Sequence, residues 1–172
     1  MNHKLIIGIV TLCFGALIAV GMLAINGSGG QAQSTVKKRV LETQKSDKVM
    51  WQLADKKQGV YYFGFEECLW CQELSPVLEK TLQQERKLAC YINTRNQFSK
   101  QSMQQLKKYF SEYRPNEQFS VPFIIFINEG GDVKTHTGTV DGHNAQLTRM
   151  NGHQKHDLHD KLAKLIVWTF KD

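Results

Sequence analysis

The chain has 172 residues, 41% hydrophobic and 22% charged, which indicates one ordinary globular domain beyond an N-terminal segment. Its four cysteines are too few for a disulfide scaffold of this size. The net charge is +6, but residues 1–45 hold five Lys or Arg and one Glu, so the remainder is almost balanced. The basic excess therefore gives no indication of nucleic-acid binding. It lies beside an apolar segment, where anionic lipids would attract it.

The first expected element is a membrane anchor within residues 1–27. Leu5 to Ile25 is an uncharged run of 21 residues. As a helix, a run of this length spans a hydrocarbon core of about 30 Å. A cleaved signal peptide is the alternative, but its apolar region is usually only about 7–15 residues long, and no small-x-small cleavage site comes after the run here. Cys13 is preceded by Leu12, so we interpret it as an apolar membrane residue and not as an acylation site.

Residues 28–45 are expected to form a spacer and a basic juxtamembrane helix, because Thr35 to Gln44 has an amphipathic pattern. The basic cluster Lys37–Arg39 lies shortly after the apolar run, and the positive-inside rule then favours a cytoplasmic domain. A short basic N-terminal region before an apolar run commonly directs the export of the downstream chain. The two rules oppose each other. We expect an extracytoplasmic domain and keep the cytoplasmic orientation as the alternative.

Residues 46–172 are predicted to form one α/β domain with a mixed sheet flanked by helices. In chain order we predict helix 46–58, strand 60–65, helix 69–84, strand 87–93, helix 100–113, strand 121–127, strand 133–139 and helix 157–170. Ser46 or Asp47 is expected to cap the first helix, and Pro76 to kink the second. The turn Glu129–Asp132 predicts a hairpin between the last two strands.

The most informative motif is Cys68-Leu69-Trp70-Cys71, which comes after a predicted strand and opens a predicted helix. Two thiols at this spacing can close a disulfide reversibly. The helix N-terminus favours thiolate at the first sulfur, because its free N–H groups and dipole stabilise negative charge. We therefore predict Cys68 as the nucleophile and Cys71 as the resolving cysteine of a thiol–disulfide exchange site.

These residues resemble the thioredoxin fold over about residues 46–170. The resemblance rests on Cys68 and Cys71, on Pro76 five residues after the second cysteine, and on the later Val121-Pro122 before an apolar strand. It implies that Pro122 is cis, that it lies against the cysteine pair, and that Gly138 matches a glycine after the next strand. The predicted substrate groove comprises Pro122, Val121, Trp70 and Leu69, and the Val121 backbone would pair with an extended substrate.

Within that superfamily the chain is similar to the bacteriocin transport accessory proteins of Gram-positive bacteria. The matching pattern is G-x-x-x-C-x-x-C-x-x-x-x-P, which runs from Gly64 through the cysteines to Pro76. This resemblance implies disulfide formation or repair in secreted cysteine-containing peptides, with a redox partner protein and no organic or metal cofactor.

Two departures from the thioredoxin pattern affect the chemistry. Thioredoxins carry a buried acid six residues before the first cysteine, and here that position is Tyr62. Deprotonation of Cys71 would then need another base or water. Glu66 and Glu67 precede the motif and are expected to disfavour a nearby thiolate, which favours isomerase or reductase activity over a strong oxidase.

Simpler interpretations compete for several residues. Cys68 and Cys71 could form a permanent disulfide or half a zinc site completed by His153, His156 or His159, although the nearest of these is 82 residues away. We interpret that histidine run as a solvated helix start. Cys90, Trp51 and Trp168 are predicted in the core, and Trp70 either contacts substrate or packs at the sheet edge.

The sequence thus predicts a membrane-anchored thiol–disulfide oxidoreductase that acts on exported peptides or proteins. Two alternatives remain open: a reductase of the same fold, and a non-catalytic secretion accessory module in which the cysteine pair is structural. No nucleic-acid partner and no metal are predicted.

Overall fold

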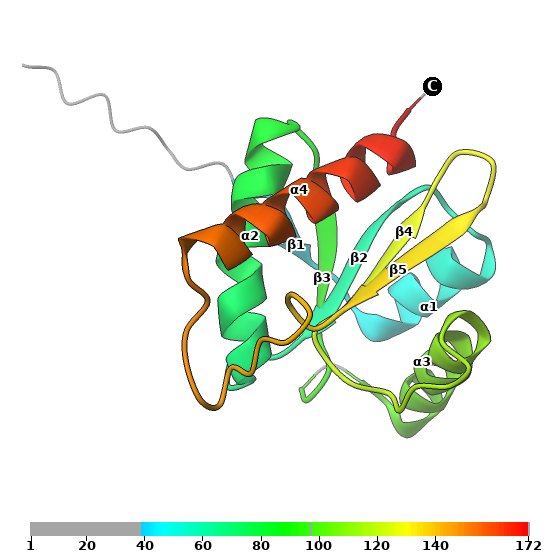
Figure 1. Cartoon of the computed structure of the whole chain (residues 1–172). Helices are drawn as coiled ribbons and strands as arrows, with labels where there is room; N and C mark the ends of the chain where they lie inside the picture. Colours follow the sequence, from blue (N-terminus) through cyan, green and yellow to red (C-terminus); the bar gives the residue numbers. More distant parts are fainter. Residues whose placement is uncertain (1–38, 97, 172) are drawn as a thin grey trace, which may run out of the picture. The chain divides into compact units, whose positions relative to one another are not determined.

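The computed structural model describes residues 39–96 and 98–171, which form a five-stranded sheet with helices on both faces (Figure 1). The strands are β1 (Leu41–Thr43), β2 (Gly59–Gly64), β3 (Ala89–Asn93), β4 (Phe123–Ile127) and β5 (Val133–Thr137). The helices are α1 (Ser46–Ala54), α2 (Leu69–Gln84), α3 (Lys100–Tyr113) and α4 (Gly152–Thr169). The predicted order of elements from residue 46 onward is confirmed. Helix α2 continues through Pro76 as one element.

The sheet is mixed, with the strand order β1-β3-β2-β4-β5. Strands β1 and β2 run parallel to β3, whereas β4 runs antiparallel to both β2 and β5. In the β2–β4 pair, Phe63 lies opposite Phe123. The residues just after Phe63 therefore meet the residues just before Phe123 at one edge of the sheet. This register brings the cysteine motif to the loop that contains Pro122.

Alternation along the strands gives each face of the sheet its own core. Helices α2 and α4 cover one face of the sheet, and α1 and α3 cover the other (Figure 1). Tyr62 on β2 belongs to the core under α2 and α4, and Tyr61 belongs to the core on the opposite face. Both tyrosines are 1% exposed. β2 is the central strand, and its buried residues contribute to both cores. Packing on both faces of the sheet therefore fixes the C-terminal end of β2, after which α2 begins.

Helix α4 begins five residues before its predicted start at residue 157. Asn151 caps it through a capping box, in which its side chain accepts from the Gln154 N–H while Gln154 Oε1 accepts from the Asn151 N–H. An Asn with Gln three residues later is a recognisable helix start. The predicted stripe is confirmed in part, because Leu158, Leu162 and Ile166 are fully buried whereas Leu165 and Trp168 lie half-buried at the rim.

The predicted helix over 35–44 is wrong in its described portion, where Leu41–Thr43 form strand β1. Val40 is buried in the core, and its carbonyl accepts a hydrogen bond from Ala89 N–H at 2.9 Å. Pairing with the neighbouring strand therefore outweighs the weak amphipathic pattern of a short segment.

Helix α1 corrects two further predictions. Neither Ser46 nor Asp47 caps it, because the capping position is Lys45, and the Asp47 carboxylate instead accepts a 2.8 Å hydrogen bond from Ser102 on α3. Trp51, predicted in the core, is 79% exposed. Val49 and Leu53 already fill the inner face of this nine-residue helix, so Trp51 lies on its outer face.

Residues 1–38 lie outside the described part of the chain, so the predicted anchor at Leu5–Ile25, Cys13 and most of the juxtamembrane segment stay predictions. Between residues 39 and 171, with residue 97 left aside, none of the helices has the length and apolar character needed to cross a membrane.

Helix α1 provides a direct test of these burial assignments. Leu53→Ala should lower the free energy of unfolding by about 2–5 kcal/mol, because it empties a site that is 1% exposed. Trp51→Ala should change it by no more than about 0.5 kcal/mol, since this side chain is mostly in solvent. Urea denaturation monitored by circular dichroism measures both. Equal losses in the two variants would contradict the placement of α1.

Candidate active site

Cys68 and Cys71 lie where strand β2 ends and helix α2 begins. Cys68 is the N-cap of α2, and its sulfur accepts a hydrogen bond from Cys71 N–H at 3.2 Å. Both residues are free thiols and largely buried, with Cys68 8% and Cys71 3% exposed. The predicted position at a helix N-terminus is confirmed, and Cys68 is the more accessible of the two residues.

The loop before β4 completes this site. The Val121–Pro122 peptide bond is cis, as the resemblance implied, and the Cys68 thiol donates to the Val121 carbonyl at 3.7 Å. Gly138, which has a left-handed φ of 65°, donates its N–H to the Pro122 carbonyl at 3.1 Å. The end of β5 therefore fixes the proline loop against the first cysteine.

The two thiols have opposite acidities. Hydrogen bonds from the Cys71 side chain and from the backbone N–H groups of Trp70 and Cys71 outweigh burial and lower the pKa of Cys68 to about 7. The pKa of Cys71 is raised well above its ordinary range, first by its hydrogen bond to Cys68 and then by burial. Near neutral pH the negative charge therefore resides on Cys68, while Cys71 keeps its proton.

The expectation that Glu66 and Glu67 disfavour a thiolate at Cys68 is wrong, because the pKa of Cys68 is lowered. Glu67 lies 3.6 Å from the Arg95 guanidinium, which also stacks on the Phe65 ring at 4.0 Å. The hydrogen bonds to the Cys68 sulfur are the main causes that lower the pKa of Cys68, and Arg95 adds a smaller contribution, so the thiolate is favoured and not disfavoured. The sequence offered a usable signal here, since Arg95 comes after β3 just as Phe65 comes after β2, and neighbouring parallel strands end at the same edge.

Tyr62, which stands where thioredoxins have a buried acid, lies beneath the second cysteine. Its hydroxyl is 2.8 Å from Ser75 Oγ, and its hydrogen bond to the Cys71 side chain lowers the pKa of that thiol. Burial raises the pKa of Tyr62 itself, so the phenol stays protonated and can donate. Gly64 leaves the necessary room, because a Cβ there would lie 2.9 Å from the Tyr62 oxygen and 3.1 Å from the Cys71 sulfur.

A hollow of about 440 Å³ gives solvent a route to Tyr62 and Cys71. Its wall includes residues of β1 and α2 together with Tyr62, Cys71, Ser75 and Tyr91. Water entering here can exchange protons with the Tyr62–Ser75 hydroxyl pair without passing Cys68.

The remaining predicted groove residues differ in exposure. Leu69 is 41% exposed and Trp70 is half-buried, both in the first turn of α2. Val121 is half-buried and Pro122 is buried. The geometry thus brings Val121 against Cys68 and leaves Leu69 as an apolar side chain open to a partner.

Two further residues, Cys90 and Glu73, lie outside the cysteine pair. Cys90 is half-buried on the face of α1 and α3, where burial raises its pKa, so it belongs to neither the Cys68–Cys71 pair nor the deep core. Glu73 was not anticipated from the sequence. It is 5% exposed, and its carboxylate accepts from Met150 N–H and from Arg149, both at 3.1 Å, which ties α2 to the loop before α4.

The strand order, the N-capping cysteine with its partner one turn later, and the cis-proline loop opposite them define a thioredoxin-like fold with a vicinal cysteine pair. No protein-family model matches the chain, and no curated protein matches its sequence significantly. Among solved structures it is similar to chloroplastic thioredoxin z, with 12% identity and a TM-score of 0.40, covering 72% of this chain and 95% of that one.

The acidity of Cys68 can be measured by alkylation. The rate with iodoacetamide should rise with pH around a midpoint near 7, because thiolate is the reacting form and the folded protein depresses the pKa of Cys68 to about 7. Arg95→Gln should move the midpoint upward. Peptide mapping by mass spectrometry identifies the modified residue, and a midpoint near the free-thiol value of about 8.5 would contradict the assignment.

Proposed function

We propose that this protein is a thiol–disulfide oxidoreductase in which Cys68 attacks and Cys71 resolves. The observation that carries the proposal is the Cys68 sulfur, which accepts the Cys71 N–H at the start of α2 and faces Val121 before the cis-proline. A structural disulfide needs no lowered pKa at one of its two sulfurs, whereas an exchange site does.

In the reductive direction, the Cys68 thiolate attacks one sulfur of a substrate disulfide. The substrate S–S bond breaks, a Cys68–substrate bond forms, and the released substrate thiolate takes a proton. Cys71 then loses its proton and attacks Cys68, which forms the Cys68–Cys71 disulfide and releases the second substrate thiol. The substrate gains two electrons and the enzyme loses two. Substrate oxidation is the same sequence reversed.

Tyr62 and Ser75 support the second step. When Cys71 gives up its proton, the Tyr62 hydroxyl donates to the resulting thiolate while it accepts from the Ser75 hydroxyl. Both hydroxyls are neutral, because burial raises the pKa of Tyr62 and keeps its phenol protonated, so neither group takes up the proton of Cys71. That proton therefore leaves to water in the adjoining hollow. This arrangement replaces the carboxylate relay of thioredoxins with a neutral hydroxyl pair.

An extended substrate chain would lie across the Val121–Pro122 backbone, beside the exposed Leu69 side chain and Trp70. The 3.7 Å contact between Cys68 and the Val121 carbonyl supports this path, because a chain there presents its sulfur to the nucleophile. The acidity of Cys68 favours reduction or isomerisation, since a pKa of about 7 is typical of thioredoxins and strong oxidants have values near about 3.5.

We further propose that the domain acts outside the cytoplasm, tethered through the apolar run Leu5–Ile25, on cysteines of exported peptides or proteins. Bacteriocins are the first substrate class to test, on the sequence pattern from Gly64 to Pro76. A separate redox protein would then exchange electrons with the Cys68–Cys71 pair.

Trapping of mixed disulfides in the native cell tests this function. Cys71→Ala should accumulate covalent adducts through Cys68, because nothing remains to resolve them, and reducing agents should release the captured chains for identification. The control is Cys68→Ser/Cys71→Ala, which should trap none. Adducts with exported peptides support the full proposal, and adducts only with cytosolic proteins reverse the orientation. A folded Cys71→Ala protein without adducts would favour the non-catalytic accessory module.

The role of Tyr62 leads to a kinetic prediction. Tyr62→Phe should slow release of a peptide from a preformed Cys68 mixed disulfide by about tenfold or more, because a hydrogen bond to a charged group is worth about 1.5–3 kcal/mol. Alkylation of Cys68 should be little changed. Tyr61→Phe is the matched control, since that hydroxyl donates to Lys57 O on the opposite face. Equal release rates in the two variants would rule out the hydrogen bond from Tyr62 to the Cys71 thiolate.

A further inference from the structure

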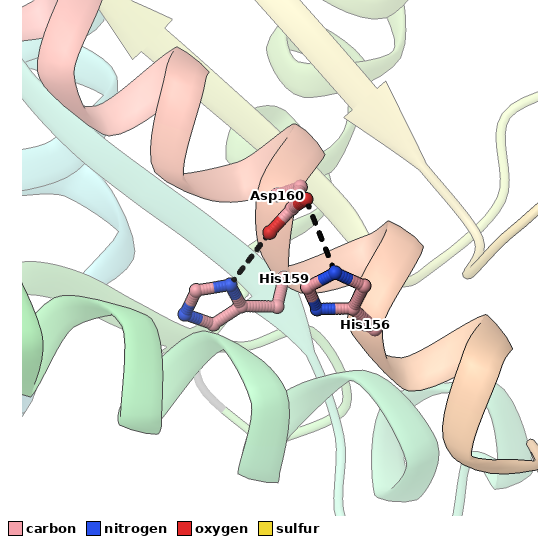
Figure 2. Close-up of side chains that lie close together, drawn as sticks. All are labelled: His156, His159 and Asp160. Carbon is pink, nitrogen blue, oxygen red and sulfur yellow. Dashed lines mark hydrogen bonds and ion pairs between the residues drawn. The ribbon is translucent and has the colours of Figure 1, made fainter.

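Three side chains of helix α4 lie close together, and two of them, His156 and His159, line the hollow between α4 and α2. Figure 2 shows Asp160 between two histidines, with one carboxylate oxygen directed to His156 and the other to His159. The His159 side chain is 26% exposed, whereas those of His156 and Asp160 are 71% and 49% exposed. Within the described residues this is the cluster of metal-ligating groups that the fold assembles, and neither Cys68 nor Cys71 belongs to it.

The spacing of the three groups suits one small cation. His159 Nδ1 lies 3.1 Å from Asp160 Oδ1, and His156 Nε2 lies 3.6 Å from Asp160 Oδ2. Tetrahedral zinc with bonds of about 2.0–2.2 Å places neighbouring ligand atoms about 3.3–3.6 Å apart. All ligand atoms lie within 4.8 Å of one another, and rotation of the exposed His156 side chain can close the widest separation.

The second nitrogen of His159 is also held. Its Nε2 lies within hydrogen-bonding distance of Gln84 Oε1, the last residue of α2. An amide oxygen at that position accepts a proton from Nε2, which leaves the Nδ1 lone pair directed toward Asp160 and His156. Ligating histidines are commonly oriented by such a partner on their other nitrogen. This contact separates the cluster from an ordinary helical ion pair, such as His153 with Asp157 one turn earlier.

We propose that His156, His159 and Asp160 form a Zn²⁺ site, with Gln84 as the positioning residue and water in the remaining coordination position. Two imidazoles and one carboxylate are a borderline-soft donor set, which suits zinc and neighbouring transition metals better than Mg²⁺ or Ca²⁺. The site is separate from the redox pair, because Gln84 lies at the opposite end of α2 from Cys68.

Bound zinc would stabilise the packing of α4 on α2. A hollow of about 740 Å³ lies between these helices, and Gln84, His156 and His159 contribute to its wall. Zinc would fix His159, which already reaches across to Gln84, and so would stabilise the folded state whenever the metal binds it more tightly than it binds the unfolded chain.

Zinc alone is the probe. Binding is measured by equilibrium dialysis and calorimetry on the full-length chain carrying Cys68→Ser and Cys71→Ser, so that the redox thiols do not compete. We expect one equivalent that raises the midpoint of thermal unfolding and is lost in His156→Ala and in Asp160→Asn. His153→Ala is the matched control, an exposed histidine of the same helix, and should keep the equivalent.

Gln84 is tested in the same background. Gln84→Leu should weaken zinc binding about tenfold or more, while Gln84→Glu, which also accepts from His159, should restore it. The proposal is overturned if the parent chain binds no zinc, or if its equivalent survives in both His156→Ala and Asp160→Asn. Loss of zinc in His153→Ala to the same degree would show diffuse histidine binding and would equally overturn it.

Discussion

The hydrogen bond from Cys71 N–H to the Cys68 sulfur is the interaction on which the site depends. It requires the first sulfur at the N-cap of α2 and the second cysteine one turn later, and it uses a backbone donor that a helix leaves free. The same helix start leaves Cys68 slightly more exposed than Cys71. The hydrogen bond between the two side chains is then the largest cause that lowers the pKa of Cys68 and raises that of Cys71. The two cysteines of one helix start thus differ in acidity, with a lowered pKa at Cys68 and a raised pKa at Cys71.

The sheet places everything else around that helix start. Because Phe63 pairs with Phe123, the chain entering β4 passes beside the chain leaving β2, and Val121 meets Cys68 there. Because β2 and β3 are parallel, Arg95 arrives at the same edge and balances Glu67. Tyr62 reaches Cys71 from within the strand, on the face that α2 covers.

Local patterns were sufficient for most of this fold and for the cysteine pair. Helices α2 and α3 matched their predicted bounds, since each has a clear apolar stripe and a distinct start. The wrong predictions have tertiary causes. Residues 41–43 form a strand because they pair with β3. Trp51 is exposed because Val49 and Leu53 occupy the buried face of α1. The contacts of Glu73 with residues 149 and 150, and of Gln84 with His159, join distant segments and are encoded by no local spacing. Arg95 could have been anticipated only through the pairing of β2 with β3.

The central claim is that Cys68 and Cys71 form a reversible redox couple and not a permanent bond. Equilibration of the purified protein in glutathione buffers of graded poise, with thiol trapping and mass spectrometry as the readout, measures it most directly. We predict a two-electron transition confined to Cys68 and Cys71, at a potential above about −300 mV. A pair that stays oxidised below about −300 mV, or that never forms a disulfide, would contradict it.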